Sequence, residues 1–86
     1  MKKIKLVKQI QQGDYIKAIN KGKFIIFKAQ EDFSSSWNSN KVEILDLNIA
    51  GLESMIGKIE YLSKFSLEHE FALYRLNKYE RWQYII

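Results

Sequence analysis

The chain has 86 residues and a formal net charge of +4, with 47% hydrophobic and 28% charged residues. A chain of this length forms one domain, because it buries only about 60 to 65% of its unfolded surface, and its apolar content excludes intrinsic disorder. The absence of cysteine excludes disulfides and thiolate metal sites and is typical of proteins in a reducing cytoplasm.

Two elements are predicted before residue 23. Residues 1–10 suit either a short helix or a strand, because their apolar positions fit both periodicities, and we favour a strand. Residues 14–21 predict a short helix that begins at Asp14 as its N-cap and is stopped by Gly22.

Two strands are predicted in the middle of the chain. Residues 23–29 are rich in β-formers and apolar on both faces, which is typical of a central strand. A second strand is indicated by the alternation of Val42, Ile44 and Leu47. Leu45 interrupts that alternation, which indicates a β-bulge.

The most regular pattern covers residues 49–64 and predicts an amphipathic helix. Its apolar side chains recur at the three-and-four spacing of one helical face. Asn48 suits the N-cap, whereas Gly51 and Gly57 each weaken such a helix by about 1 kcal/mol relative to alanine. The apolar residues of the pattern are Ile49, Leu52, Met55, Ile56, Ile59 and Leu62.

The last third of the chain predicts a hairpin. Residues 70–76 and 81–86 resemble two strands joined through Asn77, which suits a turn. Alternation places Trp82 and Tyr84 on the same face of the second strand. This terminal strand is also available for pairing across a homodimer.

Together these elements predict an α+β fold in a single small domain, residues 1–86, that is mainly antiparallel sheet with one long and one short helix. With residues 1–10 as a strand, the order contains the ferredoxin-like β-α-β-β-α-β succession followed by a C-terminal strand. We therefore expect both helices to pack on one face of the sheet.

Charge is distributed unevenly along the chain. Residues 1–28 contain eight lysines against Asp14 alone, a balance of +7, whereas residues 29–70 contain three lysines and eight acids, a balance of −5. Clustered lysines attract polyanions, so this asymmetry is one indication of DNA or RNA as a partner. Packing of the first third beside the middle, with offsetting charges, is the alternative interpretation. The residues assigned to a nucleic-acid surface are Lys21, Lys23, Arg75, Lys78 and Arg81.

Residues 21–27 resemble in part the aromatic strand signature of RNA-recognition motifs, in which Lys/Arg-Gly is followed by aromatic residues. One position between Gly22 and Phe24 is missing, so Phe24 and Phe27 point to opposite faces and do not form the usual pair of stacking rings. A buried core strand is the preferred interpretation of these residues.

Residues 31–40 form a polar loop that contains two large aromatic residues. Tryptophan is a preferred binding anchor, and loops carry binding sites more often than the scaffold does, so we expect a protein partner here. Trp37 folding back over the end of the core is the alternative. The residues assigned to a protein-docking surface are Phe33, Trp37, Asn38 and Tyr79.

No catalytic, cofactor or metal-binding pattern emerges. His69 lies between Glu68 and Glu70, but on a strand both glutamates face away from it, so a surface histidine is preferred over a metal ligand or general base. The serines at 34–36 have no activating base nearby in the sequence.

The sequence therefore predicts a small non-enzymatic binding protein. The leading hypothesis is a cytoplasmic regulator or inhibitor that docks on a larger protein, of the kind that phages and mobile elements encode. The second is a basic nucleic-acid-binding module that uses the lysine-rich first third, and a small enzyme or ligand-binding sponge is the third. No membrane partner is expected, because no apolar stretch approaches the roughly 18 residues of a membrane span.

Overall fold

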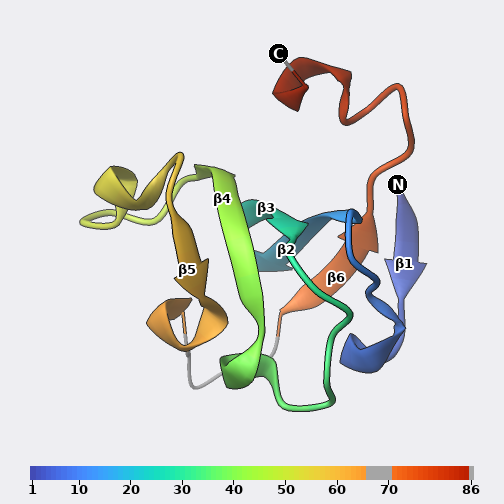
Figure 1. The fold of residues 1–86 in the computed structure, drawn as a ribbon. Coiled ribbons are helices and arrows are strands. Elements are labelled where there is room, and N and C mark those ends of the chain that lie inside the picture. Colours follow the sequence, from blue (N-terminus) through green and yellow to red (C-terminus); the bar gives the residue numbers. More distant parts are fainter. Residues whose placement is uncertain (66–70, 86) are drawn as a thin grey trace.

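A computed structural model describes residues 1–65 and 71–85, and these form one six-stranded antiparallel sheet connected by loops and short 3-10 turns (Figure 1). The strand order is β1-β6-β2-β3-β4-β5, so the last strand lies between the first two. The strands are β1 (Lys2–Ile4), β2 (Tyr15–Asn20), β3 (Lys23–Ala29), β4 (Lys41–Leu47), β5 (Ile59–Tyr61) and β6 (Ala72–Arg75). The 3-10 turns are η1 (Val7–Gln9), η2 (Trp37–Ser39), η3 (Glu53–Met55), η4 (Leu62–Phe65) and η5 (Trp82–Tyr84).

The predicted short helix over residues 14–21 is wrong, because most of this segment forms β2. Its side chains alternate between two faces: Ile16 and Ala18 are fully buried on one side, as a two-sided strand requires. Gly22 ends no helix. Together with Lys21 it forms the tight turn between β2 and β3, with φ angles of 51° and 79°, the positive values that two-residue hairpin turns demand.

The predicted long helix over residues 49–64 is also wrong, and with it the α+β fold of ferredoxin-like order. Gly51 and Gly57 both have φ of 86°, in the left-handed region that interrupts a right-handed helix. Only the short η3 forms between them. The apolar spacing has another origin, because Ile49, Leu52 and Met55 pack against the core from the connection between β4 and β5. Ile56 and Ile59 are exposed.

Both predicted central strands are confirmed. Residues 23–29 form β3, and the second strand lies within β4. The bulge is confirmed as well: Ile26 pairs with Asp46 and Phe27 pairs with Ile44, so Leu45 is the extra residue on β4. The preference for a strand in residues 1–10 holds for β1 alone, because η1 follows it.

The predicted C-terminal hairpin is wrong in its second strand. β6 lies within the first predicted strand, part of which falls outside the described residues. The segment that follows does not pair with the sheet, and Trp82–Tyr84 form η5 instead of a strand. Figure 1 shows this segment, drawn in red, running past the end of β6 beside the N-terminus. It therefore offers no terminal strand for pairing across a dimer.

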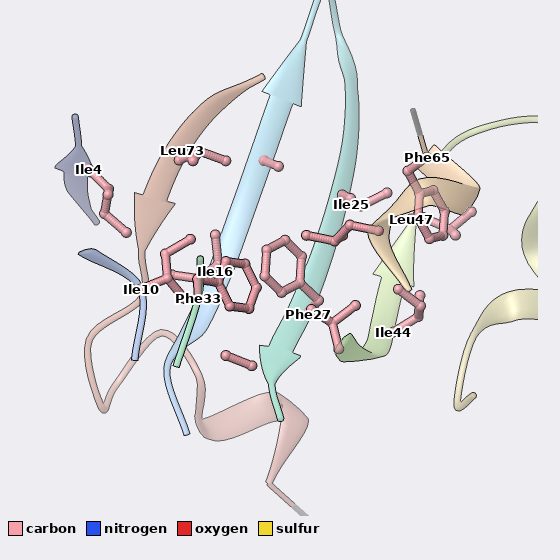
Figure 2. Packing of buried hydrophobic residues seen from close by; sticks show 14 residues of the cluster. Ile4, Ile10, Ile16, Ile25, Phe27, Phe33, Ile44, Leu47, Phe65 and Leu73 are labelled. Carbon is pink, nitrogen blue, oxygen red and sulfur yellow. The ribbon is translucent and has the colours of Figure 1, made fainter. Parts of the chain in front are cut away.

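The main core lies on one face of the sheet, which we call the inner face. Phe27 on β3 is fully buried at its centre, and Figure 2 shows it between Phe33 and Ile44. The ring of Phe27 stacks on Phe33 with centroids 5.9 Å apart, and Trp37 contacts it edge-on at 6.2 Å. The opposite, outer face has a smaller buried cluster of Tyr15, Ile26 and Leu76.

Candidate functional site

The loop before β4 is organised from inside by Asn40, the one buried polar residue in the described part of the chain. The Asn40 Oδ1 atom accepts the backbone N–H of Ser34 at 2.9 Å, and Nδ2 donates to the carbonyl oxygen of Ser36 at 2.9 Å. Longer bonds reach the carbonyl oxygens of Ser34 and Trp37. This network folds the loop back onto the core, because a buried amide needs all of these partners.

The loop therefore uses its aromatic residues for packing. Phe33 is buried against Phe27, and Trp37 is half-buried, with its ring also stacked on Phe71 at 5.5 Å. Asn38 is exposed on the loop, whereas Tyr79 follows β6. The structure thus does not bring the four predicted docking residues together, and it places two of them in or against the core.

The five cations assigned to a nucleic-acid surface are divided between the two ends of the sheet. Lys21 and Lys23 flank the β2–β3 turn, after the last residue of β2. Arg75 pairs with Ile16 near the first residue of β2, about 15 Å away at roughly 3.3 Å per strand residue. The Arg75 guanidinium also forms an ion pair with Asp14, with Nη2 and Oδ2 3.1 Å apart. These five residues do not form one continuous surface.

Residues 77–85, which we call the C-terminal segment, are fixed in place by a turn that begins at Asn77. The Asn77 Oδ1 atom accepts the backbone N–H groups of Tyr79 and Glu80 at 2.9 Å, and Glu80 Oε1 accepts the N–H of Asn77 at 3.0 Å. Glu80 Oε2 also contacts the Met1 ammonium at 3.0 Å. The Asn77 N–H and the Met1 ammonium lower the pKa of the Glu80 carboxyl below its ordinary value.

The other end of the C-terminal segment is held against the outer face. Tyr84 packs on the cluster of Tyr15, Ile26 and Leu76. Burial raises the pKa of the Tyr84 phenol, and the charge of Asp46 on β4 adds to the increase. The segment is thus attached at Asn77 and Glu80 and again at Tyr84, which gives it a defined orientation.

The segment held by these attachments presents large apolar side chains to solvent. Tyr79 is 79% exposed, Trp82 73% and Ile85 49%. With two cations they line a shallow hollow of about 530 Å³. The Lys78 ammonium lies 5.3 Å from the Tyr79 ring centre, and the Arg81 guanidinium lies 5.4 Å from that of Tyr15. We call this surface the C-terminal patch; its residues are Lys78, Tyr79, Arg81, Trp82 and Ile85.

The sequence assigned Tyr79 to the docking surface but neither Trp82 nor Ile85. Alternation along a strand placed Trp82 on the same face as Tyr84, whereas these residues form the turn η5 and only Tyr84 packs on the outer cluster. The signal that was available is the spacing of Asn77 and Glu80, because Asn followed three residues later by Glu is the start of a helical turn. That pattern predicts the turn observed here rather than a second strand.

The described residues contain no group of three or more His, Asp or Glu side chains placed to hold a metal ion. The predicted surface histidine, His69, lies outside the described residues together with Glu68 and Glu70. No helix among residues 1–65 and 71–85 has the length and apolarity to span a membrane.

No family model, curated protein or solved structure matches this chain.

Proposed function

We propose that this chain is a small non-enzymatic binding protein that docks on a larger protein, as its regulator or inhibitor, through the C-terminal patch. The observation that supports this most is the exposure of Trp82 and Tyr79 around one hollow. Monomeric proteins seldom leave such large side chains together in water, and a shared exposed patch marks an interaction site. The proposed docking surface is thus the C-terminal segment rather than the loop at 31–40.

The composition of the patch fits a protein partner. Trp, Tyr and Arg are the residue types that dominate the binding energy of protein interfaces, and all three are present here. Because Lys78 and Arg81 lie beside the apolar side chains, we infer a partner with an apolar pocket bordered by acidic residues. A chain without cysteine is compatible with this encounter in a reducing cytoplasm.

The orientation of the patch also supports the proposal. Asn77, Glu80 and Tyr84 fix the segment before binding, so little conformational entropy is lost when a partner closes over Trp82. The described edge strand β1 carries Lys2 and Lys3, which protects that edge from pairing with other strands. Docking through side chains of the patch is therefore favoured over strand addition at β1.

The test is affinity capture from the cells that express the protein. Because the chain has no cysteine, Lys64→Cys introduces a single site for attaching biotin. Lys64 is exposed on η4, which follows β5, and β5 is the edge strand opposite β1 in the sheet. We expect Trp82→Ala to reduce partner affinity about thirtyfold, equivalent to roughly 2 kcal/mol, without changing the melting temperature.

Tyr61→Ala is the matched control, because Tyr61 is an aromatic residue that is 52% exposed on β5. Partners should be retained by the wild type and by Tyr61→Ala alike. Equal retention by Trp82→Ala would contradict docking through the patch, and loss of every partner after nuclease treatment would contradict a protein partner. Sedimentation of the free chain detects the case in which the partner is a second copy.

A further inference from the structure

The sheet is divided by charge between its two halves. The four adjacent strands β1, β6, β2 and β3 contain six cations and no acidic residue, whereas β4 and β5 contain one cation and three acids. The charge asymmetry of the sequence thus becomes a basic half and an acidic half of one sheet. The six cations are Lys2, Lys3, Lys17, Lys23, Lys28 and Arg75.

The basic half places cations and rings side by side on the outer face. Lys3 pairs with Tyr74, and Tyr74 pairs with Lys17. Cross-strand partners share a face, so these three side chains form a row across β1, β6 and β2. The Lys17 ammonium lies 4.8 Å from the centre of the Phe24 ring on β3, which extends the row to a second aromatic side chain.

These groups remain accessible and uncompensated. Tyr74, Phe24 and Lys17 are half-buried and Lys3 is exposed, so each of the four residues keeps part of its surface in solvent. The ion pairs found among residues 1–65 and 71–85 join Met1 to Glu80 and Arg75 to Asp14, and neither includes Lys3 or Lys17. The C-terminal segment packs on Tyr15 and Ile26, and Ile26 is the cross-strand partner of Lys17, so the covered part of the outer face begins beside this row.

We propose that this basic face, defined by Lys3, Lys17, Phe24 and Tyr74, binds single-stranded nucleic acid. Lysine ammonium groups bind phosphates without distinguishing one base from another, and accessible aromatic rings can stack on unpaired bases. This combination of a cationic track and aromatic side chains is what sequence-tolerant single-strand binding requires. A duplex can contact only the lysines, through its phosphates, because its bases are already stacked on one another and cannot stack on the rings.

The proposal does not rest on the protein-docking function, because the two surfaces share no residue. The lysines of this face also differ from those that the sequence predicted for a nucleic-acid surface. The sequence pointed to Lys21 and Lys23 at the β2–β3 turn, whereas the register of β1, β6 and β2 brings Lys3 and Lys17 together within the sheet. Asp46 and Glu43 on β4 pair with Ile26 and Lys28, so the acidic half sets the boundary of the face.

Fluorescence anisotropy with labelled oligodeoxythymidine of about 16 nucleotides tests the proposal. The wild type should bind it more tightly than a duplex of the same length, with an affinity that falls as salt rises. The double variant Lys3→Gln/Lys17→Gln should weaken binding about tenfold and reduce the slope of log K against log salt by about 1.4, the value for two phosphate contacts to a single strand. Tyr74→Leu should weaken binding about tenfold with little change in that slope.

Lys58→Gln/Lys64→Gln is the matched control, because both lysines are exposed on the β4–β5 side and the net charge falls by the same two units. Its affinity should stay near that of the wild type, and thermal melts establish that each variant is folded. Equal losses in the two double variants, equal affinity for duplex and single strand, or binding to phosphatidylserine vesicles but not to the oligonucleotide would each overturn the proposal. If Tyr74→Leu does not fold, the two lysine variants decide the question.

Discussion

Replacing Phe27 with alanine should lower the free energy of unfolding by about 3 to 5 kcal/mol, enough to unfold most of the molecules of a domain this small. Phe27 is fully buried at the centre of the inner face, where it stacks on Phe33 and meets the edge of Trp37. Truncation removes buried apolar surface and leaves a cavity whose walls are held by β-strands on both sides. Urea denaturation followed by far-UV circular dichroism measures the loss.

Ile56→Ala is the control for the Phe27 variant. Ile56 is 43% exposed, so its truncation should change the free energy of unfolding by no more than about 0.5 kcal/mol. An amphipathic helix over residues 49–64 would instead place Ile56 in the core, at a cost of about 2 to 5 kcal/mol. A large loss in Ile56→Ala together with a small one in Phe27→Ala would contradict the fold.

Asn40→Asp should destabilise the protein by about 2 to 3 kcal/mol at neutral pH. Asn40 is 2% exposed, and its Nδ2 atom donates to the carbonyl oxygens of Ser34, Ser36 and Trp37. Aspartate keeps the shape of the side chain but replaces this donor with a charged oxygen that faces carbonyl oxygens, so a buried charge is left without a partner. Thermal and urea melts of the two proteins under the same conditions measure the difference.

The same substitution at Asn38 provides a comparison within the loop. Asn38 is exposed, so Asn38→Asp should leave stability within about 0.5 kcal/mol of the wild type. The destabilisation of Asn40→Asp should also shrink in acid, where the introduced carboxyl group is protonated and loses its charge. Equal stability of the two variants at neutral pH would show that Asn40 is not the buried centre of the loop.

The central strands were predictable because their local pattern and their tertiary environment agree. Residues 23–29 are apolar on both faces, and β3 indeed has sheet neighbours on both sides and packed clusters on both faces. Leu45 marked the bulge because one added residue reverses the alternation of every later side chain. In both cases the local pattern is compatible with a single backbone conformation.

The helices were mispredicted because apolar spacing alone does not distinguish a helix from a strand or from an irregular connection whose side chains also contact the core. Ile49, Leu52 and Met55 contact the core, as a helical face would, but two glycines with positive φ break the repeat. Residues 14–21 fit a capped helix locally, and only pairing with β3 and β6 makes this segment a strand. The residues that pair with this segment, above all those of β6, lie outside the short stretch of sequence from which the helix was predicted.

The candidate site was predictable only in part. The sequence predicted that Tyr79 is exposed. For Trp37 it left two alternatives, an exposed binding anchor or a side chain folded over the core, and the contacts with Phe27 and Phe71 agree with the second. The accessible tryptophan is Trp82, because a turn beginning at Asn77 replaces the expected strand. The basic face depends on the register of three strands that are distant in sequence, which no local pattern contains.

Acrylamide quenching of two single-tryptophan variants tests most directly whether the accessible aromatic anchor lies in the C-terminal patch. Trp37→Phe leaves Trp82 as the emitter, and Trp82→Phe leaves Trp37. With Trp82 73% exposed and Trp37 half-buried, the Trp82 emission should be red-shifted and readily quenched, and the Trp37 emission blue-shifted and protected. A protected Trp82 beside a readily quenched Trp37 would contradict the account and return the docking site to the loop.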